Sequence, residues 1–135
     1  MKTKKPRVTK NPIEFRLLVT LHYDEIQKKQ LLLIGLQTIK EFTNFQYDIV
    51  VDDALDGSRL TLNILGLRAP KGTLPRIGTA QFTKMYEKPS TIKNIVVRKM
   101  DKKENSFVVS VTKLKIRVKE QPLKAFVEIV TNRQV

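Results

Sequence analysis

The amino-acid sequence predicts a mainly β fold, either an antiparallel β-sandwich or a curved sheet of about seven strands with one helix after the first strand. Apolar and polar residues alternate along several segments, which is the pattern of half-buried strands. The stretches between these segments are short and polar, which favours antiparallel neighbours. With 135 residues, of which 41% are hydrophobic, the chain can bury a core without disulfides, and it contains no cysteine.

The first strand is predicted to begin just after Pro12. Apolar side chains at every second position from Ile13 to Leu21 alternate with mainly polar residues. Residues 1–11 differ, because they carry five cations and, after the initiator Met, one apolar side chain. Such a segment cannot bury enough apolar surface to order itself. We therefore expect a flexible basic arm over residues 1–11 and a single β-rich domain over residues 12–135.

The helix is predicted over residues 24–43. Asp24 and Glu25 suit the first turn of a helix, since acidic side chains favour that end. The centre, residues 31–36, is apolar on every side, so its periodicity fits a buried strand as well as a buried helix. Flanking Gln and Lys and the scarcity of β-branched residues favour the helix. The apolar positions with roughly helical spacing are Ile26, Leu32, Leu36, Ile39 and Phe42.

Six further strands are predicted in the rest of the chain. They span residues 47–52, 59–65, 77–87, 91–100, 106–119 and 124–131. The Asp56-Gly57 pair is a hairpin signal between the first two of these segments. Within residues 106–119, the apolar positions change from odd to even near Thr112-Lys113, which predicts a β-bulge or a bend. Phe15, Phe107 and Phe126 are expected in the core.

Charge is unevenly distributed along the chain, whose formal net charge is +13. Residues 1–20 hold six cations and one acid, residues 21–57 three cations and seven acids, and residues 58–135 seventeen cations and five acids. This segregation predicts a basic surface built from the C-terminal strands and the N-terminal arm.

Four cations, Lys113, Lys115, Arg117 and Lys119, alternate with apolar residues along one predicted strand and are expected to share its solvent face. Their spacing, roughly 6.6 Å along a strand, is close to that of successive phosphates. We therefore expect a non-catalytic module that binds a polyanion, above all nucleic-acid backbone, or an acidic protein. The further candidate contacts are Arg98, Lys99, Lys102, Lys103, Arg68, Lys71, Arg76, Lys4, Lys5 and Arg7.

A second interpretation belongs to another class, a structural or assembly β-sandwich subunit, capsid-like or tail-like, that packs through its strand edges or apolar surface. A homo-oligomer is compatible with both interpretations. The charged face of this strand can also be explained without a binding partner, since edge strands often carry Lys side chains that prevent aggregation.

The sequence contains little that indicates an enzyme or a metal-binding protein. His22 is the single histidine, and neither a phosphate-binding glycine loop nor a nucleophile motif occurs. The cluster of Asp48, Asp52, Asp53 and Asp56 is the one arrangement that could hold a hard cation, but aspartates also favour turns for their backbone hydrogen bonds. We expect no catalytic residues, no cofactor and no metal site.

The N-terminal residues are basic but are followed by no apolar segment of signal-peptide type. The longest apolar stretch, residues 31–36, is far too short to cross a bilayer. We expect no membrane span and a cytoplasmic location.

Overall fold

The computed structural model describes residues 12–69, 77–100, 103–112 and 115–131. In these ranges it contains nine strands and one short 3₁₀ helix. The strands are β1 (Phe15–Asp24), β2 (Lys29–Phe42), β3 (Asp48–Asp56), β4 (Arg59–Arg68), β5 (Gly78–Tyr86), β6 (Asn94–Lys99), β7 (Glu104–Val111), β8 (Ile116–Glu120) and β9 (Val127–Val130), and the helix is η1 (Pro89–Thr91).

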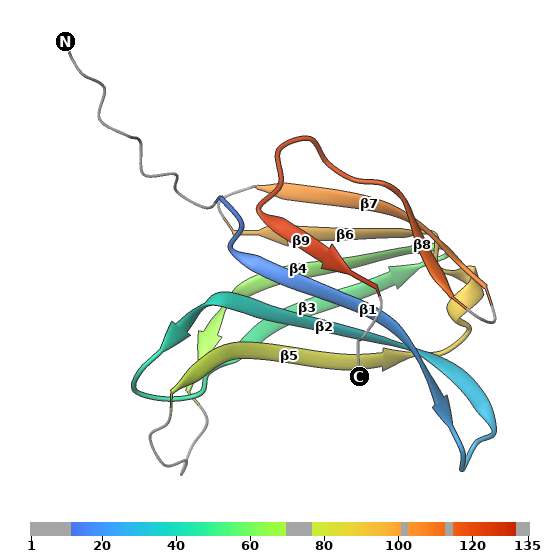
Figure 1. Ribbon diagram of the computed structural model, residues 1–135, viewed down its shortest axis with the longest axis horizontal. Helices are drawn as coiled ribbons and strands as arrows, with labels where there is room; N and C mark the ends of the chain where they lie inside the picture. The colour runs from blue at the N-terminus through green and yellow to red at the C-terminus, as the bar shows by residue number, and fades with distance from the viewer. Residues whose placement is uncertain (1–11, 70–76, 101–102, 113–114, 132–135) are drawn as a thin grey trace.

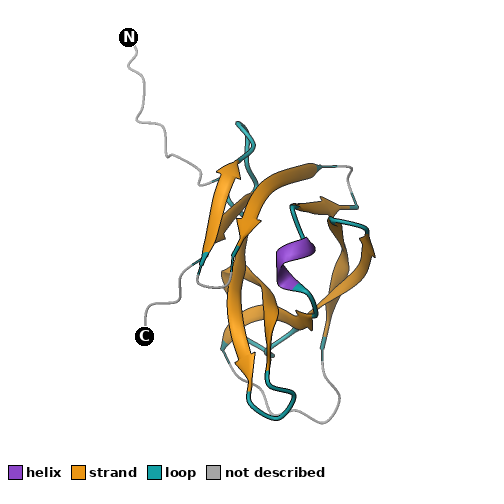
Figure 2. Cartoon of the chain, turned by 90° about the vertical axis from the view of Figure 1, so that its right-hand side faces the viewer, coloured by secondary structure: helices purple, strands orange, loops and turns teal. Residues whose placement is uncertain are grey.

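All nine strands belong to one sheet, in the order β8-β7-β6-β4-β3-β5-β2-β1-β9. The sheet curls around its core into a half-barrel (Figure 1). The helix η1 lies in the opening at one end (Figure 2), where it contacts β2 and β7. The mainly β fold class is thus confirmed, in the form of a curved sheet.

The predicted helix over residues 24–43 is wrong. These residues form a turn and the long strand β2, which pairs with β1 from Phe15 opposite Thr38 to Asp24 opposite Lys29. Asp24 accepts hydrogen bonds from backbone amides, as it would at the start of a helix, but these amides belong to a four-residue turn. Its carboxylate accepts from the amides of Ile26 and Gln27 at 2.9 and 3.3 Å. Strand β2 lies between β1 and β5, so both of its backbone edges are paired, and this pairing favours a strand where the side-chain pattern alone does not distinguish strand from helix.

The count of about seven strands is also too low. Besides β2, the predicted strand over residues 106–119 is in fact two strands, β7 and β8, paired antiparallel with Val111 opposite Ile116. The Thr112 amide donates to the Lys115 carbonyl at 2.9 Å, so the change in apolar positions marks a hairpin turn and not a bend in one strand. Both strands thereby direct apolar side chains inward.

The sheet is mixed, which corrects the antiparallel prediction. Parallel pairs form between β4 and β6, between β3 and β5, and between β1 and β9. Short turns specify antiparallel pairing only for strands that are consecutive in the chain, and these three pairs join strands that are not. The Asp56-Gly57 hairpin prediction is confirmed, because Asp56 lies opposite Arg59 and Gly57 has a φ of 62°.

The core lies on the inner, concave side of the sheet. Leu17, Leu32, Leu60 and Phe107 are completely buried there. Phe15 and Phe126 are also buried and meet edge to face, with ring centroids 6.4 Å apart, so the core prediction for the three phenylalanines is confirmed.

Candidate polyanion-binding surface

Three exposed cations, Lys115, Arg117 and Lys119, line strand β8, the last strand on one side of the sheet. We call them the β8 cation row. The apolar residues between them, Ile116 and Val118, pack into the core, so the predicted alternation is confirmed for this part. None of the three cations forms an ion pair with any residue that the structure describes. The fourth predicted member, Lys113, lies outside the described residues.

A β-bulge shapes the end of the β8 cation row. Val118 lies opposite Val109 of β7, but the next pair joins Glu120 to Val108, so Lys119 is the extra residue on β8. A bulge increases the local twist of a strand and redirects the side chain of its extra residue. The row therefore follows a twisted line and ends at an acid, Glu120.

Two further exposed cations, Arg59 and Lys93, lie in the same part of the sheet and were not among the predicted contacts. The Lys93 carbonyl accepts a hydrogen bond from the Val109 amide at 2.9 Å, which places Lys93 on the side of β7 away from β8. Arg59 lies opposite Asn94 in the parallel pair of β4 and β6. No sequence pattern predicts this placement, because it depends on a parallel pairing across more than 30 residues.

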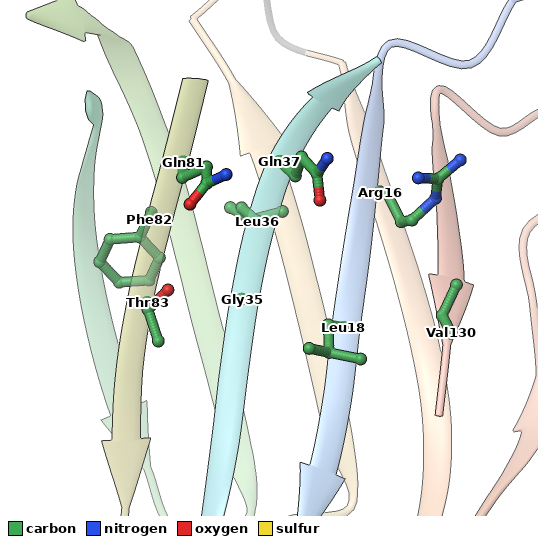
Figure 3. Close-up of a pocket in the computed structure, with 9 residues that line it drawn as sticks. All are labelled: Arg16, Leu18, Gly35, Leu36, Gln37, Gln81, Phe82, Thr83 and Val130. Atoms are coloured by element: carbon green, nitrogen blue, oxygen red, sulfur yellow. The ribbon is translucent and has the colours of Figure 1, made fainter. Parts of the chain in front are cut away.

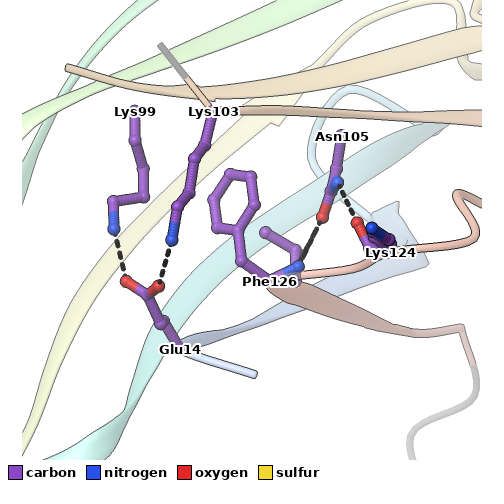
Figure 4. Close-up of polar contacts among 7 residues, drawn as sticks. Glu14, Lys99, Lys103, Asn105, Lys124 and Phe126 are labelled. Atoms are coloured by element: carbon purple, nitrogen blue, oxygen red, sulfur yellow. Dashed lines mark hydrogen bonds and ion pairs between the residues drawn. The ribbon is translucent and has the colours of Figure 1, made fainter. Parts of the chain in front are cut away.

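The predicted contacts Lys99 and Lys103 have a different role. Both ammonium groups form ion pairs with the carboxylate of Glu14, Lys103 at 3.5 Å, and thereby join the β6–β7 hairpin to the start of β1 (Figure 4). We call these three residues the Glu14 clasp. The Lys99 ammonium also lies 5.6 Å from the centre of the Phe126 ring. Arg98 is paired as well, with Glu104 across β6 and β7 at 2.9 Å.

Asn105, on the inner side of β7, makes further contacts near the Glu14 clasp. It is 3% exposed, and its side-chain oxygen accepts hydrogen bonds from the amides of Phe126 and Val127 at 2.9 and 3.1 Å. Its amide group donates to the carbonyl of Lys124 at 3.2 Å (Figure 4). The same group donates to the carbonyl of Glu104 at 3.1 Å. One buried side chain thus anchors the segment between β8 and β9 to β7.

Of the remaining predicted contacts, Arg68 is described, and it does not join the β8 cation row. Arg68 is exposed at the end of β4, opposite Asp48, and β6 and β7 separate β4 from β8 in the sheet. The other predicted contacts lie outside the described residues; they are Lys4, Lys5, Arg7, Lys71, Arg76 and Lys102.

The four aspartates of β3 do not converge. Asp52 and Asp53 are consecutive in a strand and therefore point to opposite faces, and Asp48 and Asp56 occupy its two ends. Within the described ranges, no group of three acidic or histidine side chains could hold a metal ion. The cluster gives no basis for a metal centre.

Asp53 has a structural partner instead. Its carboxylate accepts hydrogen bonds from the Tyr86 hydroxyl at 2.6 Å and from the Lys84 ammonium at 2.9 Å. The bond from Tyr86, together with the Lys84 charge, lowers the pKa of the Asp53 carboxyl below its ordinary value. Burial and the neighbouring Asp53 charge raise the pKa of Tyr86 well above the ordinary value for a tyrosine.

These bonds span a gap in the sheet. β3 and β5 are paired only at Asp48 and Gln81, and a continued ladder would bring Asp53 opposite Tyr86, each five residues further along its strand. At this point the two strands diverge, and the contact between them is the hydrogen bond from the Tyr86 hydroxyl, at the tip of its side chain, to the Asp53 carboxylate. Side-chain hydrogen bonds replace the backbone ladder there.

Comparison of the chain with family models, with curated proteins and with solved structures finds no match. Among the described residues, no helix is long and apolar enough to cross a membrane. The arrangement of the charged side chains is therefore the basis for a functional proposal.

Proposed function

We propose that this protein is a non-catalytic module that binds a polyanion, above all the phosphate backbone of nucleic acid, through the β8 cation row. The observation that carries the proposal is the contrast between two groups of predicted contacts. The cations of the row are exposed and have no acidic partner among the described residues, whereas Arg98, Lys99 and Lys103 are all ion-paired. Cations without partners can neutralise phosphate without first breaking an ion pair.

The geometry of an extended strand suits an extended polyanion. Lys115 and Arg117 are two residues apart, so along an extended strand their side chains recur at roughly 6.6 Å, which is comparable to the distance between phosphates along one nucleic-acid strand. The bulge at Lys119 sets the third cation off this regular line. Such contacts release counterions and contribute affinity that depends on salt and not on base sequence. Arg59 and Lys93 are exposed cations in the same part of the sheet, so we include them as candidate additional contacts.

The test compares two triple variants with the same loss of charge. In the first, Lys115, Arg117 and Lys119 are replaced by Gln; in the control, three exposed cations outside the candidate contacts are replaced by Gln, Lys28, Lys40 and Lys124. Binding to fluorescent DNA and RNA is measured over a series of salt concentrations. The slope of log K against log salt should fall by about 2 to 3 in the first variant, since each lost phosphate contact contributes ~0.7 to 0.9.

The control should keep most of the affinity. An equal loss in both variants would mean that only net charge matters, and the β8 cation row would not be the site. Failure of the unmodified protein to bind any polyanion at low salt would overturn the proposed function.

A structural or assembly role is the second candidate. It is favoured by a separate observation, the apolar outward side of β9, β1, β2 and β5, where Leu18 and Leu33 are only partly buried and Met85 is 43% exposed. A stable oligomer that shows no affinity for polyanions would support this role against the first.

A further inference from the structure

The central part of strand β2 is apolar on both faces, and the part of the chain that the structure describes covers only one of them. Leu32, Ile34 and Leu36 point into the core and are at most 1% exposed. Leu33 and Gly35 point to the convex side of the sheet. All nine strands belong to one sheet and η1 lies inside it, so no described element forms a second layer over the convex side (Figure 2). The apolar residues on this outer face are Leu18, Leu33, Gly35, Met85 and Val130, together with Leu31, which is 7% exposed. Polar residues, among them Gln37, Gln81 and Thr83, lie between and around them.

A hollow of about 200 Å³ lies in this outer face at Gly35 (Figure 3). Leu18 of β1 and Thr83 of β5 are the cross-strand neighbours of Gly35 and form its sides. A Cβ atom at Gly35 would lie 3.6 Å from the Leu18 Cβ and 3.7 Å from the Phe82 carbonyl oxygen, which are ordinary contacts. The backbone of Gly35 also has no positive φ. The fold therefore does not require glycine here, and glycine inside a strand weakens it.

The same face carries a side chain of suitable shape to fill the hollow. Met85 lies opposite Leu33, two residues after Thr83, and is 43% exposed. Its distance along β5 from the hollow is therefore roughly 6.6 Å. A two-fold axis that lies in the interface, midway between Met85 and the hollow, places the methionine of each copy over the hollow of the other. The unbranched thioether side chain adapts readily to such a space.

Charge favours a second copy of the chain over a charged partner. The outward positions of the four strands hold two cations, Arg16 and Lys29, and three acids, Asp24, Glu41 and Glu128, so their formal charges nearly cancel. Arg16 and Glu128 form an ion pair at 2.6 Å. The whole chain carries +13, so two copies would repel each other across most of their surfaces. This face lacks the strong positive charge of the chain as a whole, so the repulsion between two copies is weak there.

We propose that the outer face of β9, β1, β2 and β5 packs against the same face of a second copy, in a two-fold homodimer in which Met85 of each chain fills the hollow at Gly35 of the other. The interface is isologous and closed, so it produces a dimer and not a filament.

The first test is Gly35→Thr, with sedimentation equilibrium over a range of protein concentrations and no nucleic acid present. Threonine fills the hollow, and it is a better strand former than glycine. The dissociation constant of the dimer should rise at least about tenfold, because a methionine side chain loses its buried position in each copy. The midpoint of urea unfolding, measured at a concentration where the chain is monomeric, should stay constant or rise. That second measurement separates a filled hollow from a damaged fold.

Met85→Lys is the second test, because it places two like charges in the same interface and should also give a monomer. The matched control is Met100→Lys, at a methionine that is 71% exposed and lies beyond the end of β6. The control should dimerise as the unmodified chain does. A chain that stays monomeric at millimolar concentration, or a dimer that both Gly35→Thr and Met85→Lys leave intact, would overturn the proposal. Neither variant alters the β8 cation row, so this outcome is independent of polyanion binding.

Discussion

Replacement of Asn105 by Ala should destabilise the half-barrel where the segment before β9 is bound to β7. Asn105 is 3% exposed, and its side-chain oxygen is the acceptor for two buried amides, those of Phe126 and Val127. Alanine leaves both amides without this acceptor, in a part of the molecule where the Phe126 ring is also buried. The two carbonyls that Asn105 contacts lose a donor as well, although each can accept from water.

The expected loss of stability follows from these contacts. A buried donor that is left without a partner costs about 1 to 3 kcal/mol, and a typical net contribution of a hydrogen bond is about 1 kcal/mol. Two such donors give an expected destabilisation of about 2 to 4 kcal/mol. This is a large part of the ~5 to 15 kcal/mol by which a domain is usually stable. With a denaturant slope of ~1 to 3 kcal/mol per molar, the urea midpoint should fall by roughly 1 to 2 M.

The assay is urea unfolding followed by circular dichroism, together with amide hydrogen exchange. The matched control is Asn94→Ala, because Asn94 is partly buried on β6 and its side chain makes no hydrogen bond to a described residue. Exchange at Phe126 and Val127 should accelerate only in the Asn105 variant. If both variants lose the same stability, or if these two amides remain protected, the binding of this segment to β7 does not depend on Asn105 and the reasoning is refuted.

Tyr86→Phe should cost about 1.5 kcal/mol, because Asp53 loses a charge-assisted hydrogen bond, while Tyr23→Phe at an exposed tyrosine should cost nothing measurable. The Tyr86 bond lowers the pKa of Asp53 in the folded state, so its stabilisation is complete above about pH 4 and is lost as the pH falls through the folded pKa. Urea midpoints of the two proteins should therefore converge in acid, and a constant difference would contradict this. Glu14→Gln removes both ion pairs of the Glu14 clasp and should cost about 0.5 to 1 kcal/mol at low salt. That difference should shrink in high salt; one that is equal at all salt concentrations would show that charge is not responsible.

Local patterns predict local structure in this chain. The alternation after Pro12 correctly predicts β1, and the Asp56-Gly57 pair correctly predicts the turn between β3 and β4. Both signals act within a few residues, through side-chain periodicity and through a glycine with positive φ. The predicted core phenylalanines are buried for the same reason, since each lies at an apolar position within a predicted strand.

The helix prediction failed where the pattern depends on distant parts of the chain. Residues 31–36 are apolar on both faces, so no periodicity distinguishes a strand from a helix. What decides the structure is the presence of β1 on one side and β5 on the other, and β5 begins more than 40 residues later. The apolar convex side of β2, which made the segment ambiguous, is also the surface proposed for the dimer.

The candidate site could be predicted only in part for a related reason. The alternation that defines Lys115, Arg117 and Lys119 is local, and these residues are exposed as expected. In the sequence, Lys99 and Lys103 look equivalent to the cations of the β8 row. In the structure, however, Glu14, more than 80 residues away, forms ion pairs with both. Which cations have partners is a property of the tertiary structure, and a count of charges cannot reveal it.

The position of the β8 cation row on an edge strand allows a decisive distinction between two reasons for its charge. Lysines on an edge can serve to prevent pairing with another chain, since β8 has an unpaired side. If that were their whole purpose, the Gln variant of Lys115, Arg117 and Lys119 would aggregate in proportion to its concentration, and its affinity for polyanions would match that of the equally charged control. If the cations bind phosphate, the same variant stays soluble and loses the salt-dependent part of its affinity. Since three alternating cations at an edge fit both purposes, light scattering and the salt series on one protein sample give the answer together.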